Sequence, residues 1–283
     1  MPLWIRDIRF FILFAALIRL VNITSPPVEV GHNWRQSTGL MVARNFVEEK
    51  LDVFHPRVDM AGQLSGITGM EFPLLNAAHA AVSKVFGYEH WYGRLIVLLL
   101  SSWAMWSLYC LLKGVQNERM SRATIVVLTA SLWFGYSRKI MPDVFSCSLV
   151  ILGVHAFAQG WQSHRKRQWI AWSALGALAI TAGLLSKLPS GILLAGFLPF
   201  LPVISGHWKC KSSLVLLLPG ILGVLWWYFL WSPSLVENYG FWHFFMGKSG
   251  SEGWVELMNQ PGVWAKHFYD HSLKFVGFAV FLF

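Results

Sequence analysis

A polar segment with the sequence GHNWRQ occupies residues 31–36, soon after the first apolar stretch of the chain. Polar and charged side chains that lie against a bilayer need a reason to be there, and a site that meets a substrate carried by a lipid supplies one. We therefore take His32 as a candidate catalytic group. Trp34 and Arg35 are candidate substrate-binding groups.

Basic side chains recur where other apolar stretches end. Arg138 and Asp143 belong to the turn RKIMPD, and Lys187 belongs to the turn SKLP. With Arg19 and Arg94, these cations suit an anionic group such as a lipid phosphate, which basic side chains bind by charge-assisted hydrogen bonds. Taken singly, each has a structural alternative: a snorkelling arginine, a Pro-Asp turn that caps a helix, or a helix end. Their grouping on one side of the membrane favours function.

Glu71 follows the glycine-rich run AGQLSGITG and precedes Phe-Pro-Leu. Glycine lets a backbone turn tightly or approach a ligand, which favours a catalytic carboxylate. The carboxylate would equally stabilise the start of the next helix through its dipole. His267 and His271 have helical spacing, but no third ligand has a recognisable spacing to them, so we predict no metal site there.

The composition places these residues in a membrane protein. Hydrophobic residues make up 55% of the 283 positions and charged residues only 13%, against about 25% charged residues in a soluble domain. We predict an all-α integral membrane protein with about eight transmembrane helices, since each needs ~20 mostly apolar residues. The candidate segments are Phe10–Ile23, Trp91–Leu112, Ala123–Tyr136, Val144–Trp161, Trp169–Ser186, Ser190–Ile204, Leu214–Trp231 and Leu273–Phe283.

The formal charge of +9 indicates topology and not a nucleic-acid partner, because the basic residues form short runs between apolar segments. With the N-terminus inside, the inner segments hold two acidic residues, Asp7 and Glu118, against a large basic excess. These inner basic residues are Arg6, Arg9, Lys113, Arg119, Arg122, Arg165, Lys166, Arg167, Lys209 and Lys211. The positive-inside rule therefore places the N-terminus in the cytoplasm.

The organisation that follows is a single membrane domain over residues 1–283. Residues 24–90 form an extracytoplasmic cap with interfacial helices, one of them expected near residues 72–86 because polar residues interrupt its apolar sequence. Residues 232–271 form a second extracytoplasmic loop. The candidate site then faces the periplasm or exterior, and we expect the membrane to be the bacterial inner membrane.

The motifs WRQ, ARNF, PRVDMAGQLSGITGMEFPL, the FG turn, GRL, the MPD turn and the Lys-x-Pro turn occur in one order. In that order they resemble a branch of the polytopic GT-C glycosyltransferases, the group of protein O-mannosyltransferases and of the aminoarabinose transferase that acts on lipid A. The resemblance covers residues 1 to about 205. It is carried by the order of the motifs far more than by any one of them.

This resemblance implies transfer of a sugar from a polyprenyl-phosphate carrier to a glycan, lipid or protein acceptor, with inversion at the anomeric carbon. Glu71 matches the loop carboxylate that deprotonates or orients the acceptor, and Asp143 matches the acid of the second outer turn. Lys187 matches the basic residue of the Lys-x-Pro turn, and Arg138 is a further phosphate ligand. The sugar and any cofactor, including a divalent metal, stay open.

Two departures from the family pattern keep alternatives open. Thr38 stands where an Asp is expected, and its hydroxyl is no base at neutral pH, so Glu29, His32 or Glu71 would take that role. The sequence also ends inside the apolar run FVGFAVFLF. An inactive truncated fragment is therefore one alternative. A polyprenyl-lipid transporter is another, although the related halves typical of transporters are not visible in the sequence.

Overall fold

The computed structural model describes residues 7–27, 32–196, 214–240 and 250–268. These residues form helices and connecting loops, with a single isolated β-bridge between Arg57 and Ile67 and no strand in the described ranges. The helices are α1 (Ile8–Leu20), α2 (Asn33–Glu48), α3 (Leu74–Phe86), α4 (Tyr92–Lys113), α5 (Glu118–Thr129), α6 (Leu132–Tyr136), α7 (Pro142–Gln162), α8 (Lys166–Ser186), α9 (Leu188–Ala195), α12 (Leu218–Trp226), a π-helical turn (Trp227–Trp231), α13 (Ser232–Tyr239), α14 (Gly250–Asn259) and α15 (Pro261–Phe268). The expected all-α class is confirmed.

Three of the described helices, α4, α7 and α8, are long and apolar enough to cross a bilayer. Their lengths of 22, 21 and 21 residues meet the requirement of ~20 residues. The prediction of about eight spans is wrong for the part of the chain that the structure describes. Two of its candidates, Ser190–Ile204 in part and Leu273–Phe283 entirely, lie outside the described residues.

Other predicted spans fail because their helices are short or broken. Helix α1 has 13 residues. The apolar stretch 123–136 divides between α5 and α6, because the Ser131 side chain accepts a hydrogen bond from the Trp133 amide and caps a new helix. Apolar composition predicts burial in lipid, but it does not reveal where such a local cap stops a helix.

The segment from Leu218 to Tyr239 runs without a break as α12, the π-helical turn and α13. The π turn carries Trp227 and Tyr228, both about 1% exposed. Rare π turns frequently mark functional sites. The predicted apolar span ended at Trp231, and the helical column continues beyond it as the more polar α13.

The centre of the bundle is the pair α7 and α8, which approach closely through small residues. A Cβ added to Gly153 would lie 2.8 Å from the Gly176 carbonyl oxygen, and one added to Gly183 would lie 2.8 Å from the Ser146 carbonyl oxygen. Small residues let helix backbones approach in this way inside a membrane. Phe157 and Ile180 from this pair form one apolar cluster with Trp227.

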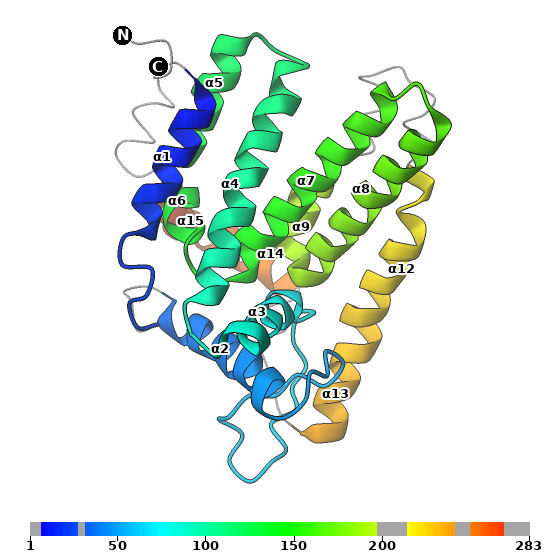
Figure 1. The fold of residues 1–283 in the computed structure, drawn as a ribbon. Coiled ribbons are helices and arrows are strands. Elements are labelled where there is room, and N and C mark those ends of the chain that lie inside the picture. Colours follow the sequence, from blue (N-terminus) through cyan, green and yellow to red (C-terminus); the bar gives the residue numbers. More distant parts are fainter. Residues whose placement is uncertain (1–6, 28–31, 197–213, 241–249, 269–283) are drawn as a thin grey trace.

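Helices α2 and α3 lie together across one end of the bundle (Figure 1). Their contact buries Val42 and Phe46 of α2 and Ala80 of α3. Helix α3 occupies the stretch where an interfacial helix was expected. The loops before α4 and before α7 and the end of α8 lie at this same end, so they can contribute side chains to one site between the long helices and α2 and α3 (Figure 1).

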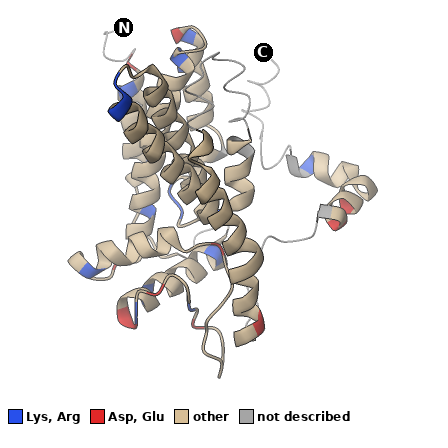
Figure 2. Cartoon of the chain, turned by 90° about the vertical axis from the view of Figure 1, so that its right-hand side faces the viewer, with Lys and Arg blue, Asp and Glu red and all other residues tan. Residues whose placement is uncertain are grey.

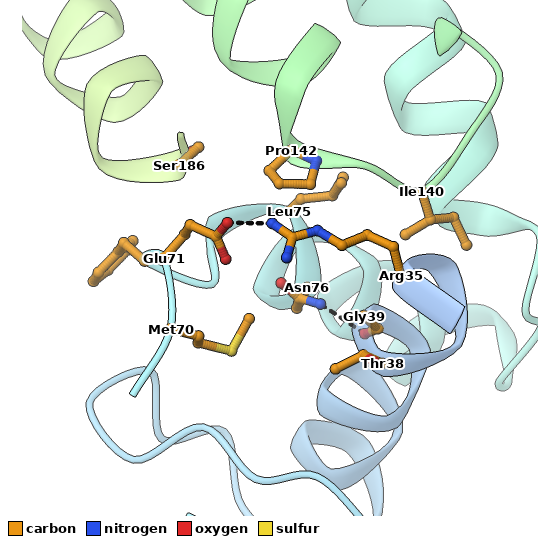
Figure 3. A pocket seen from close by; sticks show the side chains of 11 residues that line it. Arg35, Thr38, Gly39, Met70, Glu71, Leu75, Asn76, Ile140, Pro142 and Ser186 are labelled. Atoms are coloured by element: carbon orange, nitrogen blue, oxygen red, sulfur yellow. Dashed lines mark hydrogen bonds and ion pairs between the residues drawn. The ribbon is translucent and has the colours of Figure 1, made fainter. Parts of the chain in front are cut away.

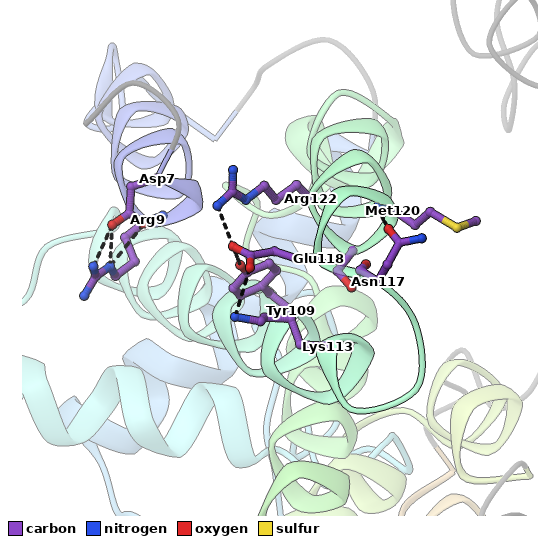
Figure 4. Close-up of polar contacts among 9 residues, drawn as sticks. Asp7, Arg9, Tyr109, Lys113, Asn117, Glu118, Met120 and Arg122 are labelled. Atoms are coloured by element: carbon purple, nitrogen blue, oxygen red, sulfur yellow. Dashed lines mark hydrogen bonds and ion pairs between the residues drawn. The ribbon is translucent and has the colours of Figure 1, made fainter. Parts of the chain in front are cut away.

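The opposite end of the bundle carries the loops predicted to be cytoplasmic. There Glu118 accepts hydrogen bonds from Tyr109 at 3.1 Å and Arg122 at 2.5 Å, and Lys113 lies 3.5 Å from it (Figure 4). In the bundle, charged residues gather towards the two ends and are sparse along the long helices, and a helical arm at its side carries further charges (Figure 2). This distribution is the one that a bilayer-spanning bundle requires.

Candidate active site

Helix α2 presents one polar face to the bundle. Arg35, Thr38 and Gly39 line the same cavity, as residues spaced i, i+3 and i+4 must when they belong to a helix. The neighbouring Gln36 is fully buried and accepts a hydrogen bond from the Ile140 amide at 3.4 Å. This bond ties the WRQ motif to the turn that leads into α7.

The segment that carries Glu71 is held by its backbone. The Met70 carbonyl accepts hydrogen bonds from the Trp227 indole at 3.0 Å and the Ser232 hydroxyl at 3.3 Å. The Phe72 amide donates to the Leu185 carbonyl at 3.1 Å. A Cβ on Gly69 would lie 2.4 Å from the Ser232 carbonyl oxygen. The glycine is therefore needed for this close approach to α13.

Glu71 is the centre of a buried ion cluster. Its Oε1 accepts hydrogen bonds both from the Arg35 guanidinium and from the Lys187 ammonium, the latter at 2.5 Å. The Glu71 side chain is 8% exposed. Burial by itself raises the pKa of this carboxyl, but the charges of Arg35 and Lys187 and the Lys187 hydrogen bond outweigh burial and lower the pKa below its ordinary value.

Lys187 is placed by the end of α8. The Ser146 hydroxyl of α7 donates to the Gly183 carbonyl at 2.7 Å and to the Lys187 carbonyl at 3.1 Å. Tyr228 donates to the Leu185 carbonyl at 2.9 Å and accepts from the Leu188 amide at 3.2 Å. The helix end that carries Lys187 is therefore fixed from two sides.

Arg35 and Glu71 border a small cavity (Figure 3). Its walls come from α2, the Glu71 segment, the start of α3, the turn before α7 and the end of α8. The Asn76 amide crosses one side of it and donates to the Gly39 carbonyl at 2.6 Å. The cavity has a volume of about 40 Å³, which admits water but no sugar, given the ~30 Å³ that one water takes up in the liquid.

The ion cluster carries an excess of positive charge. Two cations meet one carboxylate, so a formal charge of +1 is left beside the cavity. The Arg35 and Lys187 side chains remain 14% and 18% exposed. A cluster of this kind can accept one more anion by charge-assisted hydrogen bonds, at least in part by exchange with the carboxylate.

Of the seven candidate site residues, the structure brings Arg35, Glu71 and Lys187 into direct contact. Asp143 lies in the first turn of α7, next to the cavity-lining Pro142, and its carboxylate accepts a hydrogen bond from Ser190 at 3.1 Å. Asp143 itself is not among the residues that line the cavity.

The remaining three candidates lie outside the cavity wall. Trp34 is 47% exposed, and Arg138 is half-buried in the turn between α6 and α7. His32 precedes α2 with φ of +58°, in the left-handed region that side chains rarely adopt. Its Nε2 lies 2.7 Å from the Tyr136 hydroxyl. Glu29, the other alternative base, lies outside the described residues.

Arg19 and Arg94 do not join the ion cluster. Arg94 donates to the carbonyls of Ile23, Ser25 and Pro26 at 2.7–3.3 Å. Arg19 donates to the Ala15 carbonyl at 3.0 Å and to serine hydroxyls, among them Ser137 at 2.5 Å. Both guanidinium groups satisfy polar groups of their own chain. Arg19 and Arg94 therefore bind elsewhere than the ion cluster, which contains Lys187 and also Arg35.

The structure also identifies residues that the sequence did not. Asn76 and Ser186 line the cavity, and Tyr228 fixes the end of α8. Asn76 belongs to a segment that was expected to lie at the membrane surface because of its polar residues.

Thr38, the departure from the family pattern, does lie in the cavity wall, where its hydroxyl donates to the Trp34 carbonyl at 2.9 Å. Among the residues that the structure describes, no group of three His, Cys, Asp or Glu residues could hold a metal ion.

Comparison with known proteins identifies the class. Residues 71–234 match the family model of the dolichyl-phosphate-mannose-protein mannosyltransferases. This match covers more than half of the chain, so the chain belongs to that family, a branch of the GT-C glycosyltransferases. The family assignment and the apolar helices together make it an integral membrane protein. No curated protein matches the sequence.

Two crystal structures share the fold. The chain is similar to ArnT from Cupriavidus metallidurans in the apo state, with a TM-score of 0.60 and 16% sequence identity over 91% of this chain and 49% of that one. It is also similar to the same protein bound to undecaprenyl phosphate, with a TM-score of 0.58 and 16% identity over 81% and 41% of the two chains. The present chain thus spans about half the length of ArnT.

Proposed function

We propose that this chain is a membrane glycosyltransferase that moves a sugar from a polyprenyl-phosphate carrier to an acceptor on the extracytoplasmic side. The observation that carries the proposal is the ion cluster of Arg35, Glu71 and Lys187, which joins a carboxylate to two cations beside a cavity at one end of the bundle. Family membership supports the reaction class. The structural relative that binds undecaprenyl phosphate supports the type of carrier.

In the first step, the donor phosphate exchanges for Glu71 as the partner of the two cations. A phosphate offers several acceptor oxygens to the Arg35 and Lys187 donors, which now converge on a single oxygen, Oε1 of Glu71. The exchange pulls the cations away from the carboxylate and enlarges a cavity that at present admits only water. It also frees Glu71 to act as a base, because loss of its cationic partners raises its pKa.

In the second step, the acceptor hydroxyl attacks the anomeric carbon of the sugar. The bond between that carbon and the phosphate oxygen breaks, and the oxygen leaves with the electron pair as a lipid phosphate. The proton of the acceptor hydroxyl passes to Glu71. Lys187 and Arg35 stabilise the charge that develops on the departing phosphate. Asp143 orients the acceptor from the start of α7, and Arg138 is a further contact to the phosphate.

In this proposal, His32 and Trp34 lie where substrates enter the site of the ion cluster. His32 is hydrogen-bonded to Tyr136 on the side of the turn that leads to α7, and it is the alternative base to Glu71. The exposed Trp34 indole contacts the sugar or the lipid.

The test is transfer of labelled sugar from a panel of undecaprenyl-phosphate sugars by the purified protein in liposomes. Lys187→Ala should weaken both donor binding and turnover, because the phosphate contact exists before and during the reaction. Asp143→Asn should lower turnover far more than donor binding. Lys84→Ala, which removes an exposed lysine of α3, is the matched control. Failure to bind or use any donor of the panel would contradict the proposal, as would equal binding by wild type and Lys187→Ala.

The orientation has its own test. In a variant without the native cysteines, Ser65→Cys in the loop before α3 should react with an impermeant thiol reagent in intact cells. Ser163→Cys, at the end of α7, should stay unlabelled until the membrane is opened. Labelling of position 163 alone would reverse the proposed topology.

A further inference from the structure

A second cavity lies at the other end of α2, away from the ion cluster. Its volume is about 260 Å³, which is several times the ~30 Å³ of one water in the liquid and just below the ~300–1,000 Å³ of small-molecule sites. The residues that give it polar character are Asn45, Glu49, Lys50, Asp52, His55, Arg57 and Tyr239. A cavity of this size accommodates one small polar ring.

Hydrogen bonds and close backbone contacts hold the walls of this cavity in place. The Asn45 amide donates to the Arg57 carbonyl at 3.0 Å, and the Arg57 guanidinium donates to Glu49 at 2.8 Å. Arg57 also forms the β-bridge with Ile67. A Cβ on Gly66 would lie 2.4 Å from the Val58 carbonyl oxygen, and the φ of +74° at Gly66 suits glycine. The loop and the end of α2 therefore form one fixed wall, a precondition for a binding site.

His55 and Tyr239 line this cavity with their rings, and Trp231 packs behind His55. The His55 ring makes edge-to-face contacts with Trp231 at 5.6 Å and with Tyr239 at 6.3 Å, measured between ring centroids. The Trp231 indole donates to the Phe54 carbonyl at 2.9 Å, which docks this loop on the helical column. The Tyr239 side chain has an apolar ring and a polar hydroxyl, so it suits a ligand that has both C–H groups and hydroxyl groups.

The charges of the cavity balance. Glu49 and Asp52 supply two carboxylates, and Lys50 and Arg57 supply two cations. A strongly anionic or cationic ligand would find no net attraction here, in contrast to the excess positive charge at the ion cluster. The described residues hold no metal-binding group of His, Cys, Asp or Glu. Alternating donors and acceptors beside aromatic rings fit a neutral, polyhydroxylated ligand, and a sugar ring is the chemical class that combines these properties.

We propose that this cavity binds a neutral sugar unit of the acceptor, so that the acceptor is a glycan or glycolipid. On α2, Gly39 borders the first cavity and Asn45 borders the second, and a helix places residues six positions apart about 9 Å from each other along its axis. A sugar attached directly to the donor phosphate stays close to that phosphate, so a longer acceptor glycan is the source of the sugar in the second cavity. The assignment to the acceptor rests on the proposed glycosyltransferase function, but binding of a sugar does not.

Saturation-transfer NMR on the full chain in nanodiscs tests the proposal with three separate probes: methyl β-D-glucopyranoside, methyl α-D-mannopyranoside and methyl N-acetyl-β-D-glucosaminide. We expect at least one to give ring-proton signals that fall several-fold in Tyr239→Ala and in Asp52→Asn. Phe86→Ala, which removes an exposed aromatic ring of α3, is the matched control and should keep the signals. Thermal unfolding shows which variants stay folded, and the milder Asp52→Asn covers the case in which Tyr239→Ala does not fold.

The outcomes separate the two proposals. Signals lost in both cavity variants and kept in Glu71→Gln support a sugar site that is independent of the ion cluster. Absence of signals with all three probes overturns the inference, and so do signals that both cavity variants retain. Displacement of the bound sugar by inorganic phosphate would also overturn it, because an anion site would then be present. Sugar binding without transferase activity would leave the cavity assigned as a sugar site and reject the proposed function.

Discussion

Two arginines near the same end of the bundle, one fully buried and one partly buried, have opposite environments. Arg94 is fully buried and donates hydrogen bonds to the carbonyls of Ile23, Ser25 and Pro26. Arg35 shares a carboxylate with Lys187 beside a cavity, and its side chain keeps 14% exposure. The first guanidinium holds a loop in place. The second belongs to a cluster that can exchange partners.

The partners of a cation separate structural from functional cations in a membrane protein. Any buried cation is costly at membrane depth, and each must be compensated. Arg94 donates to backbone carbonyls of one loop, and a ligand could displace these carbonyls only if that loop unfolded. A carboxylate side chain compensates Arg35 and Lys187 reversibly, since a phosphate offers the same kind of oxygen atoms.

The largest effect should come from Glu71→Gln. This change leaves two buried cations with a neutral amide, and breaking a buried ion pair costs on the order of 3–5 kcal/mol. We expect a matching fall in the free energy of unfolding, measured by denaturation in detergent, together with loss of sugar transfer.

A second variant sharpens this result. Glu71→Gln combined with Lys187→Met removes one of the two stranded cations, so it should recover part of the lost stability, as a double-mutant cycle would show. Recovery of stability without recovery of transfer would confirm that the cluster has a role beyond folding. Additive losses in the cycle would contradict the ion cluster itself.

Arg94→Met should destabilise the protein by a smaller amount and for another reason. The loss of the charge-assisted hydrogen bonds to Ile23, Ser25 and Pro26 is offset in large part because the variant no longer buries a charge. We expect lower thermal stability with unchanged affinity for undecaprenyl phosphate. A large loss of lipid affinity at normal stability would place Arg94 in the site and break the comparison.

The sequence predicts some of this arrangement and not the rest. The helices α4, α7 and α8 could be predicted because length and apolar composition suffice for a bilayer-spanning helix. Their contacts could not, since Glu71 and Lys187 are 116 positions apart and meet only through the ends of α3 and α8. The roles of Arg19 and Arg94 were misjudged for a related reason. A sequence shows that a cation is buried, but it does not show whether carbonyls or a carboxylate surround it.

A third prediction concerns the backbone clamp that positions Glu71. Gly69→Ala would force a Cβ to within 2.4 Å of the Ser232 carbonyl oxygen, and overpacking of this kind typically costs about 1–3 kcal/mol. Because the clamp sets the position of Glu71, turnover should also fall. Gly135→Ala is the control, since a Cβ at that helical glycine meets nothing within 4 Å. Equal behaviour of the two variants, in unfolding and in turnover, would show that the clamp does not constrain the site.

The smallest effect should be the dependence of stability on pH, and its sign follows from Glu71. The folded state lowers the pKa of this carboxyl, with burial opposing the shift and Arg35 and Lys187 producing it. A group with a depressed pKa stabilises the fold above its unfolded pKa of about 4.5, and this stabilisation is lost as the pH falls towards the folded pKa.

Between pH 7 and pH 5 the free energy of unfolding should therefore change little through Glu71, and it should decrease below that range. Asp52 contributes a similar background, because hydrogen bonds from His55 and the Phe54 amide lower its pKa against the effect of burial. The contribution of Glu71 is thus the difference between wild type and Glu71→Gln across the acid range. If that difference is flat below pH 4.5, Glu71 is not held ionised by Arg35 and Lys187, and the distinction between the two arginines loses its electrostatic basis.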